Sequence, residues 1–166
     1  MKVLLLIPFL SLAVLSMAAC GGSDEETLPS IQPTPTQSDE DDESETATSV
    51  KMNVVVGDRT ITATMEDNAA AQDFLSRLPL EVTLNDFNNT TEKIFYPNPA
   101  LMVEGVTRGC APSPGDITIY VPWSNVAIFC KSWSHSNDLI KIGHIDDNGI
   151  EALNIGGDIT VKFERQ

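Results

Sequence analysis

Short apolar runs rich in β-branched residues, each bounded by turn residues, dominate the sequence from residue 50 onward. The two clearest are 116–121 and 126–130, which are separated by the turn sequence 122–125. In the first, aliphatic residues at every second position alternate with Thr118 and Tyr120, so one face should be buried and Tyr120 should lie on the other. Weaker runs of the same kind are 51–56, 60–65, 80–84, 93–95, 101–106, 139–145 and 158–163. This series predicts a mainly β fold, a closed barrel of about eight strands, with a two-sheet sandwich as the competing arrangement.

A single amphipathic segment interrupts the strand pattern after the first predicted hairpin. Asp67 or Asn68 is suited to cap a helix there, and Pro79 would end it. Between them, apolar residues with helical spacing share one face: Ala70, Phe74, Leu75 and Leu78. We expect one helix at this place and a second, shorter helical turn over 149–153.

The first twenty residues have the pattern of an export signal. Lys2 gives a basic start, 3–17 is an apolar run too short to span a membrane comfortably, and small residues precede Cys20. This pattern resembles the lipobox of bacterial lipoproteins, in which the cysteine receives a lipid and becomes the new N-terminus. We therefore expect 1–19 to be a signal peptide and Cys20 to anchor an exported protein in the membrane of the bacterial cell envelope. The outer membrane is the expected location. Residues 23–26 resemble an acidic surface-export signal, which adds the cell surface as a second expectation.

The segment 20–49 should be a disordered tether between this anchor and a folded domain at 50–166. It consists mainly of Gly, Ser, Thr, Pro and acidic residues, which cannot bury enough apolar surface to offset the ordering entropy. Nine of the chain's 24 acidic residues lie in 21–49, where there is no Lys or Arg. An acidic binding tail is the alternative role. The net charge of −14 repels phosphate backbones, so we expect no nucleic-acid partner, and we expect a monomer.

Two cysteines remain within the predicted domain, Cys110 and Cys130. In an exported chain they can form a disulfide, which would close a loop of roughly twenty residues and stabilise the fold by about 3 kcal/mol. Two buried free thiols are the equally acceptable alternative, because cysteine is also a common small core residue. Zinc is disfavoured since no His stands at ligand spacing from either one. The acids in 146–151 lack the alternating oxygen ligands of a calcium loop, so a plain turn is favoured there and we expect no metal site.

The residues 114–130, PGDITIYVPWSNVAIFC, resemble the bacterial cyclophilin-like family, the small barrel domains that share the cyclophilin fold. The supporting pieces, in order along the chain, are 65–68, 78–80, 92–93 and 142–145. The resemblance spans nearly all of 50–155. It implies a β-barrel with a helix plugging an open end, and a family whose function is largely unassigned.

The resemblance does not extend to the catalytic residues of the cyclophilins themselves. Their phenylalanine-histidine-arginine signature and their glutamine-glycine-glycine-aspartate segment are absent, although Gly156-Gly157-Asp158 matches part of the latter. A triad can be written from Ser134, His144 and Asp146, but no nucleophile elbow surrounds the serine. We therefore expect no catalytic residues and no cofactor.

A shallow binding cleft is the site that the sequence favours most. Two tryptophans in a chain with few aromatic residues fall in predicted loops beside the central strands. The candidate cleft residues are Arg108, Tyr120, Trp123, Phe129, Trp133 and His144. The competing interpretation is that the tryptophans cover the open ends of the barrel and that His144 is a satisfied barrel residue. A non-catalytic module that binds a peptide, glycan or small ligand is the first functional hypothesis; a diverged enzyme, such as a weak prolyl isomerase, and an accessory that docks on another envelope protein are the alternatives.

Overall fold

A computed structural model describes residues 49–166 of the chain. The predicted signal peptide, the lipidation site Cys20 and nearly all of the predicted tether lie outside the described residues. No helix among residues 49–166 is long and apolar enough to cross a bilayer.

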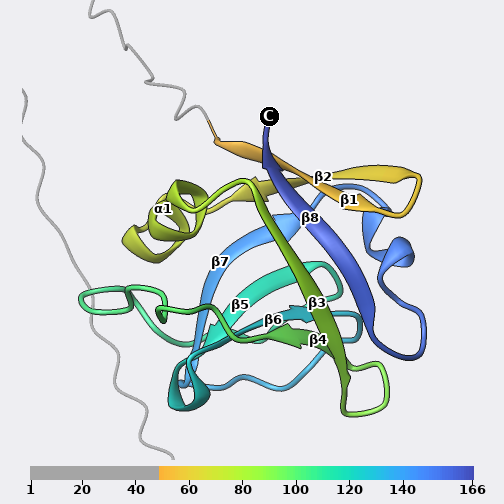
Figure 1. Ribbon diagram of the computed structural model, residues 1–166. Helices are drawn as coiled ribbons and strands as arrows, with labels where there is room; N and C mark the ends of the chain where they lie inside the picture. Colours follow the sequence, from red (N-terminus) through yellow and green to blue (C-terminus); the bar gives the residue numbers. More distant parts are fainter. Residues whose placement is uncertain (1–48) are drawn as a thin grey trace, which may run out of the picture. The chain divides into compact units, whose positions relative to one another are not determined.

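Eight strands close into an antiparallel barrel, which confirms the predicted fold class (Figure 1). They are β1 (Lys51–Val56), β2 (Arg59–Met65), β3 (Leu80–Phe87), β4 (Glu92–Phe95), β5 (Asp116–Tyr120), β6 (Asn125–Phe129), β7 (Leu139–Ile145) and β8 (Ile159–Arg165). Their order around the barrel is β1-β2-β7-β5-β6-β4-β3-β8, and β8 closes the ring by pairing with both β1 and β3. Closure leaves no free sheet edge, which removes a site of strand-to-strand aggregation.

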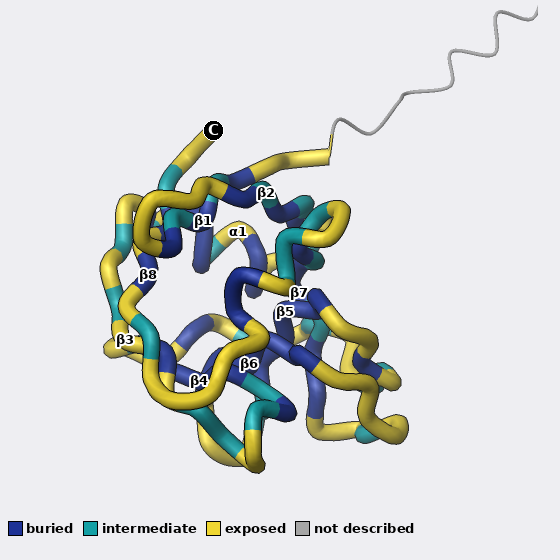
Figure 2. Tube along the Cα trace, turned by 90° about the vertical axis from the view of Figure 1, so that its right-hand side faces the viewer, coloured by how far each residue is buried: buried dark blue, intermediate teal, exposed yellow. Residues whose placement is uncertain are grey.

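The interior of the barrel holds the main hydrophobic core. Alternation along the strands sends every second side chain inward, as with Val54 in β1, Ile119 in β5 and Phe163 in β8. The outer faces of β1, β2 and β8 are largely solvated, whereas every residue of β6 is buried. Figure 2 shows the same concentration of buried residues around β5, β6 and β7. Burial of both faces of β6 means that further side chains cover the outside of the barrel there.

The helix α1 (Ala69–Ser76) lies after the first hairpin, where the sequence predicts it. Asn68 is its N-cap, and the side-chain Oδ1 accepts a hydrogen bond of 2.9 Å from the Ala71 N–H. Phe74 is fully buried and packs its ring edge-to-face against Phe163, with the centroids 5.3 Å apart. This contact docks the helix onto the barrel core. The second predicted helical turn is a 3-10 helix, η2 (Gly149–Ala152).

One predicted strand is wrong. Residues 101–106 form no strand but belong to the long connection between β4 and β5. Leu101 is buried, and Val103 and Val106 pack against the core from the side. Residues 101–106 therefore form a loop whose apolar side chains anchor it on the core. These side chains have the spacing of a strand, but the segment pairs with no neighbouring strand.

Candidate functional site

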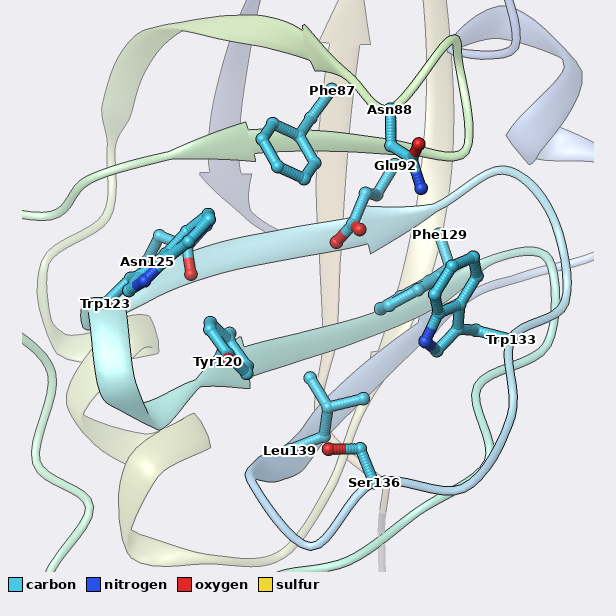
Figure 3. A pocket seen from close by; sticks show the side chains of 10 residues that line it. All are labelled: Phe87, Asn88, Glu92, Tyr120, Trp123, Asn125, Phe129, Trp133, Ser136 and Leu139. Carbon is cyan, nitrogen blue, oxygen red and sulfur yellow. The ribbon is translucent and has the colours of Figure 1, made fainter.

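A pocket of about 280 Å³ opens on the outer face of the barrel, over β4, β6 and β5 (Figure 3). Its lining contains five aromatic rings together with four polar residues and a leucine. The lining residues are Phe87, Asn88, Glu92, Tyr120, Trp123, Asn125, Phe129, Trp133, Ser136 and Leu139. Four of the six predicted cleft residues are among them: Tyr120, Trp123, Phe129 and Trp133.

The strand register places these side chains on one surface. In β6, Asn125 and Phe129 line the pocket, while Val126 and Ile128 between them face the main core. Phe129 lies opposite Glu92 of β4, and Asn125 lies opposite Tyr120 of β5. A small outer cluster of Ile94, Ala127, Phe129 and Leu139 lies on this face, and Phe129 and Leu139 of this cluster line the pocket. This cluster explains why β6 is buried on both faces.

Trp123 forms one wall of the pocket and is held by two neighbouring rings. It ends the 3-10 helix η1 (Val121–Trp123), and the chain reverses at Ser124, which has the left-handed φ of 53°. The indole meets Phe87 at an interplanar angle of 87° with centroids 5.7 Å apart, and Tyr120 at 86° and 5.4 Å. Half of Trp123 nevertheless remains exposed, at 50%. The ring is thus oriented by packing but open to solvent.

The opposite wall comes from the segment between β6 and β7, which is tied down at its backbone. The Trp133 N–H donates to the Pro112 carbonyl at 3.0 Å. Ser136 and Cys110 exchange backbone hydrogen bonds of 3.0 and 3.3 Å as an isolated bridge. These bonds fix the loop that carries Trp133 and Ser136, so the two walls face each other across the pocket.

Two polar groups in the pocket lack partners among residues 49–166. Figure 3 shows the Glu92 carboxylate pointing into the space between the aromatic walls. No cationic side chain of the described domain lies within ion-pair distance of it, and burial raises the pKa of Glu92 above its ordinary value of 4.5. Asn125 is only 2% exposed, and its Oδ1 has no hydrogen-bond partner within the same residues. An unpaired buried acceptor is costly, so the Asn125 oxygen would gain from a donor that reaches it, and the half-buried Glu92 carboxylate would gain from a cation.

Two predicted cleft residues lie elsewhere. Arg108 is exposed in the connection between β4 and β5 and does not line the pocket. His144 lies in β7 with its Nδ1 2.8 Å from Oδ1 of Asp116. Lys141 Nζ is also 2.8 Å from that same oxygen. His144 is therefore a satisfied barrel residue, which was the competing interpretation of its place in an apolar strand.

The triad written from the sequence is not assembled. His144 contacts Asp116 in place of Asp146, whose carboxylate instead accepts from Lys51 at 2.8 Å and from Thr64 at 2.7 Å. Ser134 is exposed in the loop after β6. No group of three or more His, Cys, Asp or Glu side chains within residues 49–166 is placed to hold a metal ion.

The two cysteines of the domain are free thiols in the structure. Cys130 is buried in the main core, with Sγ 3.8 Å from the Leu153 carbonyl, whereas Cys110 packs against the outer cluster. The sheet separates the two clusters. Burial raises the pKa of both thiols.

Comparison with known proteins agrees with this architecture. One similar solved structure is the solution structure of the hypothetical protein AF2241 from Archaeoglobus fulgidus. The match covers 71% of this chain and 95% of that chain, with a TM-score of 0.55 and 17% sequence identity, and it shows that the two share a fold. A search of curated proteins found no match. The model of the cyclophilin-like family matches residues 54–164, nearly the whole described barrel. The chain therefore belongs to the cyclophilin-like family.

Proposed function

We propose that this protein is a lipoprotein of the bacterial cell envelope whose cyclophilin-like barrel binds a ligand in the outer-face pocket without transforming it. The observation that carries the binding role is the pocket itself, where Trp123 and Trp133 are each about half exposed at 50% and 49%. Trp123 in particular is fixed by packing and yet open to solvent, and such a ring is typical of ligand sites because it supplies contact area at little entropic cost.

A binding role is favoured over catalysis by the chemistry of the lining. Its ten residues include no His, Cys, Lys or Arg, and Glu92 is the one charged residue among them. Prolyl isomerases use an arginine at their site, and Arg108 lies outside this pocket. A protease-coupled peptide assay tests the enzyme alternative: turnover proportional to the dose of pure protein would contradict the proposal.

The envelope location is proposed from the first twenty residues. Replacing the lipidation site, Cys20→Ser, should move the protein from the membrane fraction to the soluble fraction while the barrel stays folded. Metabolic labelling with a radioactive fatty acid should mark the wild type and leave the variant unmarked. An unlabelled wild type, or a variant that still sediments with membranes, would contradict the anchor.

The binding role is tested with one probe for each ligand class: a proline-containing tetrapeptide, cellobiose and choline. The wild type should bind at least one of them, Trp123→Ala should lose that binding, and the melting temperature should change little. Tyr96→Ala is the matched control, because Tyr96 is 57% exposed and does not line the pocket. If Trp123→Ala lowers the melting temperature strongly, Trp123→Leu keeps a larger apolar side chain at this position without the ring and repeats the test. Failure of all three probes to bind would contradict the role.

A further inference from the structure

The pocket has the walls of an aromatic cage. The indole of Trp123 stands nearly perpendicular to both Phe87 and Tyr120, at 87° and 86°. Figure 3 shows Phe129 and Trp133 on the other side of the space into which Glu92 points. Rings set at right angles enclose a small group from several sides.

The electrostatics of this cage favour a positive guest. The faces of aromatic rings carry negative potential, and a cation placed over them is attracted most strongly by tryptophan. Glu92 adds a formal negative charge that no cation of residues 49–166 neutralises. A carboxylate held among apolar rings without a partner is unfavourable in the empty pocket, so a bound cation would relieve that cost.

Asn125 adds an acceptor next to the charge site. Its amide is 2% exposed, it lines the pocket, and its Oδ1 is unpartnered among the described residues. A guest that carries a hydroxyl or N–H donor beside its cationic centre satisfies this oxygen. The lining thus offers a guest aromatic faces, one carboxylate and one free hydrogen-bond acceptor. Its hydrogen-bond donors are limited to the side chains of Asn88, Asn125 and Ser136, the Tyr120 hydroxyl and the indole N–H groups.

We propose that the pocket recognises an organic cation, an alkylated ammonium group with a neighbouring hydrogen-bond donor, carried either by a small molecule or by a lysine side chain of a peptide. This inference rests on the proposed function, since it names the ligand class of the same pocket. It follows from the juxtaposition of the perpendicular rings, the unpaired Glu92 and the unpartnered Asn125.

The test compares choline with 3,3-dimethyl-1-butanol, a neutral molecule of the same shape, on the full-length protein by isothermal titration calorimetry. Choline should bind about tenfold more tightly, because only the cation gains from the ring faces and the carboxylate. Glu92→Gln should weaken choline binding about tenfold and leave the neutral analogue unaffected. Glu104→Gln is the matched control, since Glu104 is exposed in the loop between β4 and β5. Trp123→Leu keeps an apolar side chain but removes the ring, and it should weaken choline about fivefold or more.

The outcomes separate this inference from the proposed function. If choline and its neutral analogue bind equally, or if the peptide or cellobiose probe binds through Trp123 while choline does not, the pocket is a ligand site but not a cation site. If none of the probes binds, both proposals fail. A trimethyllysine peptide, an unmodified lysine peptide and free choline distinguish the sources: tighter binding of either peptide assigns a protein partner, and tighter binding of choline assigns a small molecule.

Discussion

Lys93 Nζ lies 3.6 Å from Asp86 Oδ2 inside the hairpin formed by β3 and β4, with the lysine side chain fully buried. The same ammonium donates to the carbonyls of Ile155 and Gly157 at 2.5 and 2.6 Å. Asp86 and Lys93 are paired across the hairpin, and their chain neighbours Phe87 and Glu92 form the next pair, which lines the pocket. The fully buried lysine thus holds the β3–β4 hairpin, which carries one wall of the pocket, against the turn before β8.

Removing this ammonium should destabilise the barrel. Lys93→Met leaves the two carbonyls without their donor and Asp86 without its cation, and we expect the free energy of unfolding to fall by about 3 kcal/mol. Lys131→Met is the control, because that lysine is exposed and bonds one loop carbonyl; it should change stability by about 0.5 kcal/mol or less. Urea denaturation measures both. Equal stability of the Lys93 variant and the wild type would contradict the structural role.

Asp116 should stabilise the fold in a pH-dependent way. Burial opposes its ionisation, but hydrogen bonds from Lys141, from the Ser113 N–H and from His144 outweigh burial and hold the pKa of Asp116 below its ordinary value of 3.8. A lowered folded-state pKa gives a stabilisation that is fully present above pH 3.8 and is lost as the pH falls through the folded-state value.

We therefore expect Asp116→Asn to lower the free energy of unfolding by about 2 kcal/mol at pH 7. The difference from the wild type should shrink as the pH falls below 3.8. Asp138→Asn, at an exposed position, serves as the control. Urea denaturation at pH 7 and again below pH 3.8 measures the difference in stability between the variant and the wild type. A difference that is the same at both pH values would show that the aspartate contributes packing rather than charge.

Glu92 should have the opposite effect on stability. Because burial raises the pKa of Glu92, its ionised form is disfavoured in the folded state, and it costs stability at pH values above the raised pKa. Glu92→Gln should then melt at a higher temperature than the wild type at pH 7, and this gain should vanish below pH 4.5, where the wild-type carboxyl is protonated in both states. A variant that is less stable than the wild type at pH 7 would mean that the carboxylate has a stabilising partner. A charge that costs stability in the empty pocket is consistent with a role in binding.

The fold was predictable because its signals are local. Both the alternation in 116–121 and the Asn68 cap follow from nearby residues. The connection at 101–106 misled because a loop that anchors apolar side chains on a core has the same pattern as a strand.

Only some of the residues that line the pocket were predictable, because the others reach it through the pairing of strands that are distant in sequence. The exposed aromatic residues Trp123 and Trp133 could be identified one by one. Phe87 and Glu92 join them only because β4 pairs with both β3 and β6, and no sequence pattern specifies which strands become neighbours. The alternation of side chains along β6 is the one signal that could have identified Asn125. Because Asn125 lies four positions before Phe129 in the same strand, both side chains face the same side of the sheet.

The central claim is that the pocket between the two tryptophans takes a cation, and these are the only tryptophans in the chain. In a ¹H–¹⁵N correlation spectrum their two indole N–H signals therefore report directly on the site. Titration with choline should shift both signals in the wild type, and much less in Glu92→Gln, while 3,3-dimethyl-1-butanol shifts them little. Indole signals that stay fixed at high choline concentration, or that respond equally to the neutral analogue, would contradict the claim.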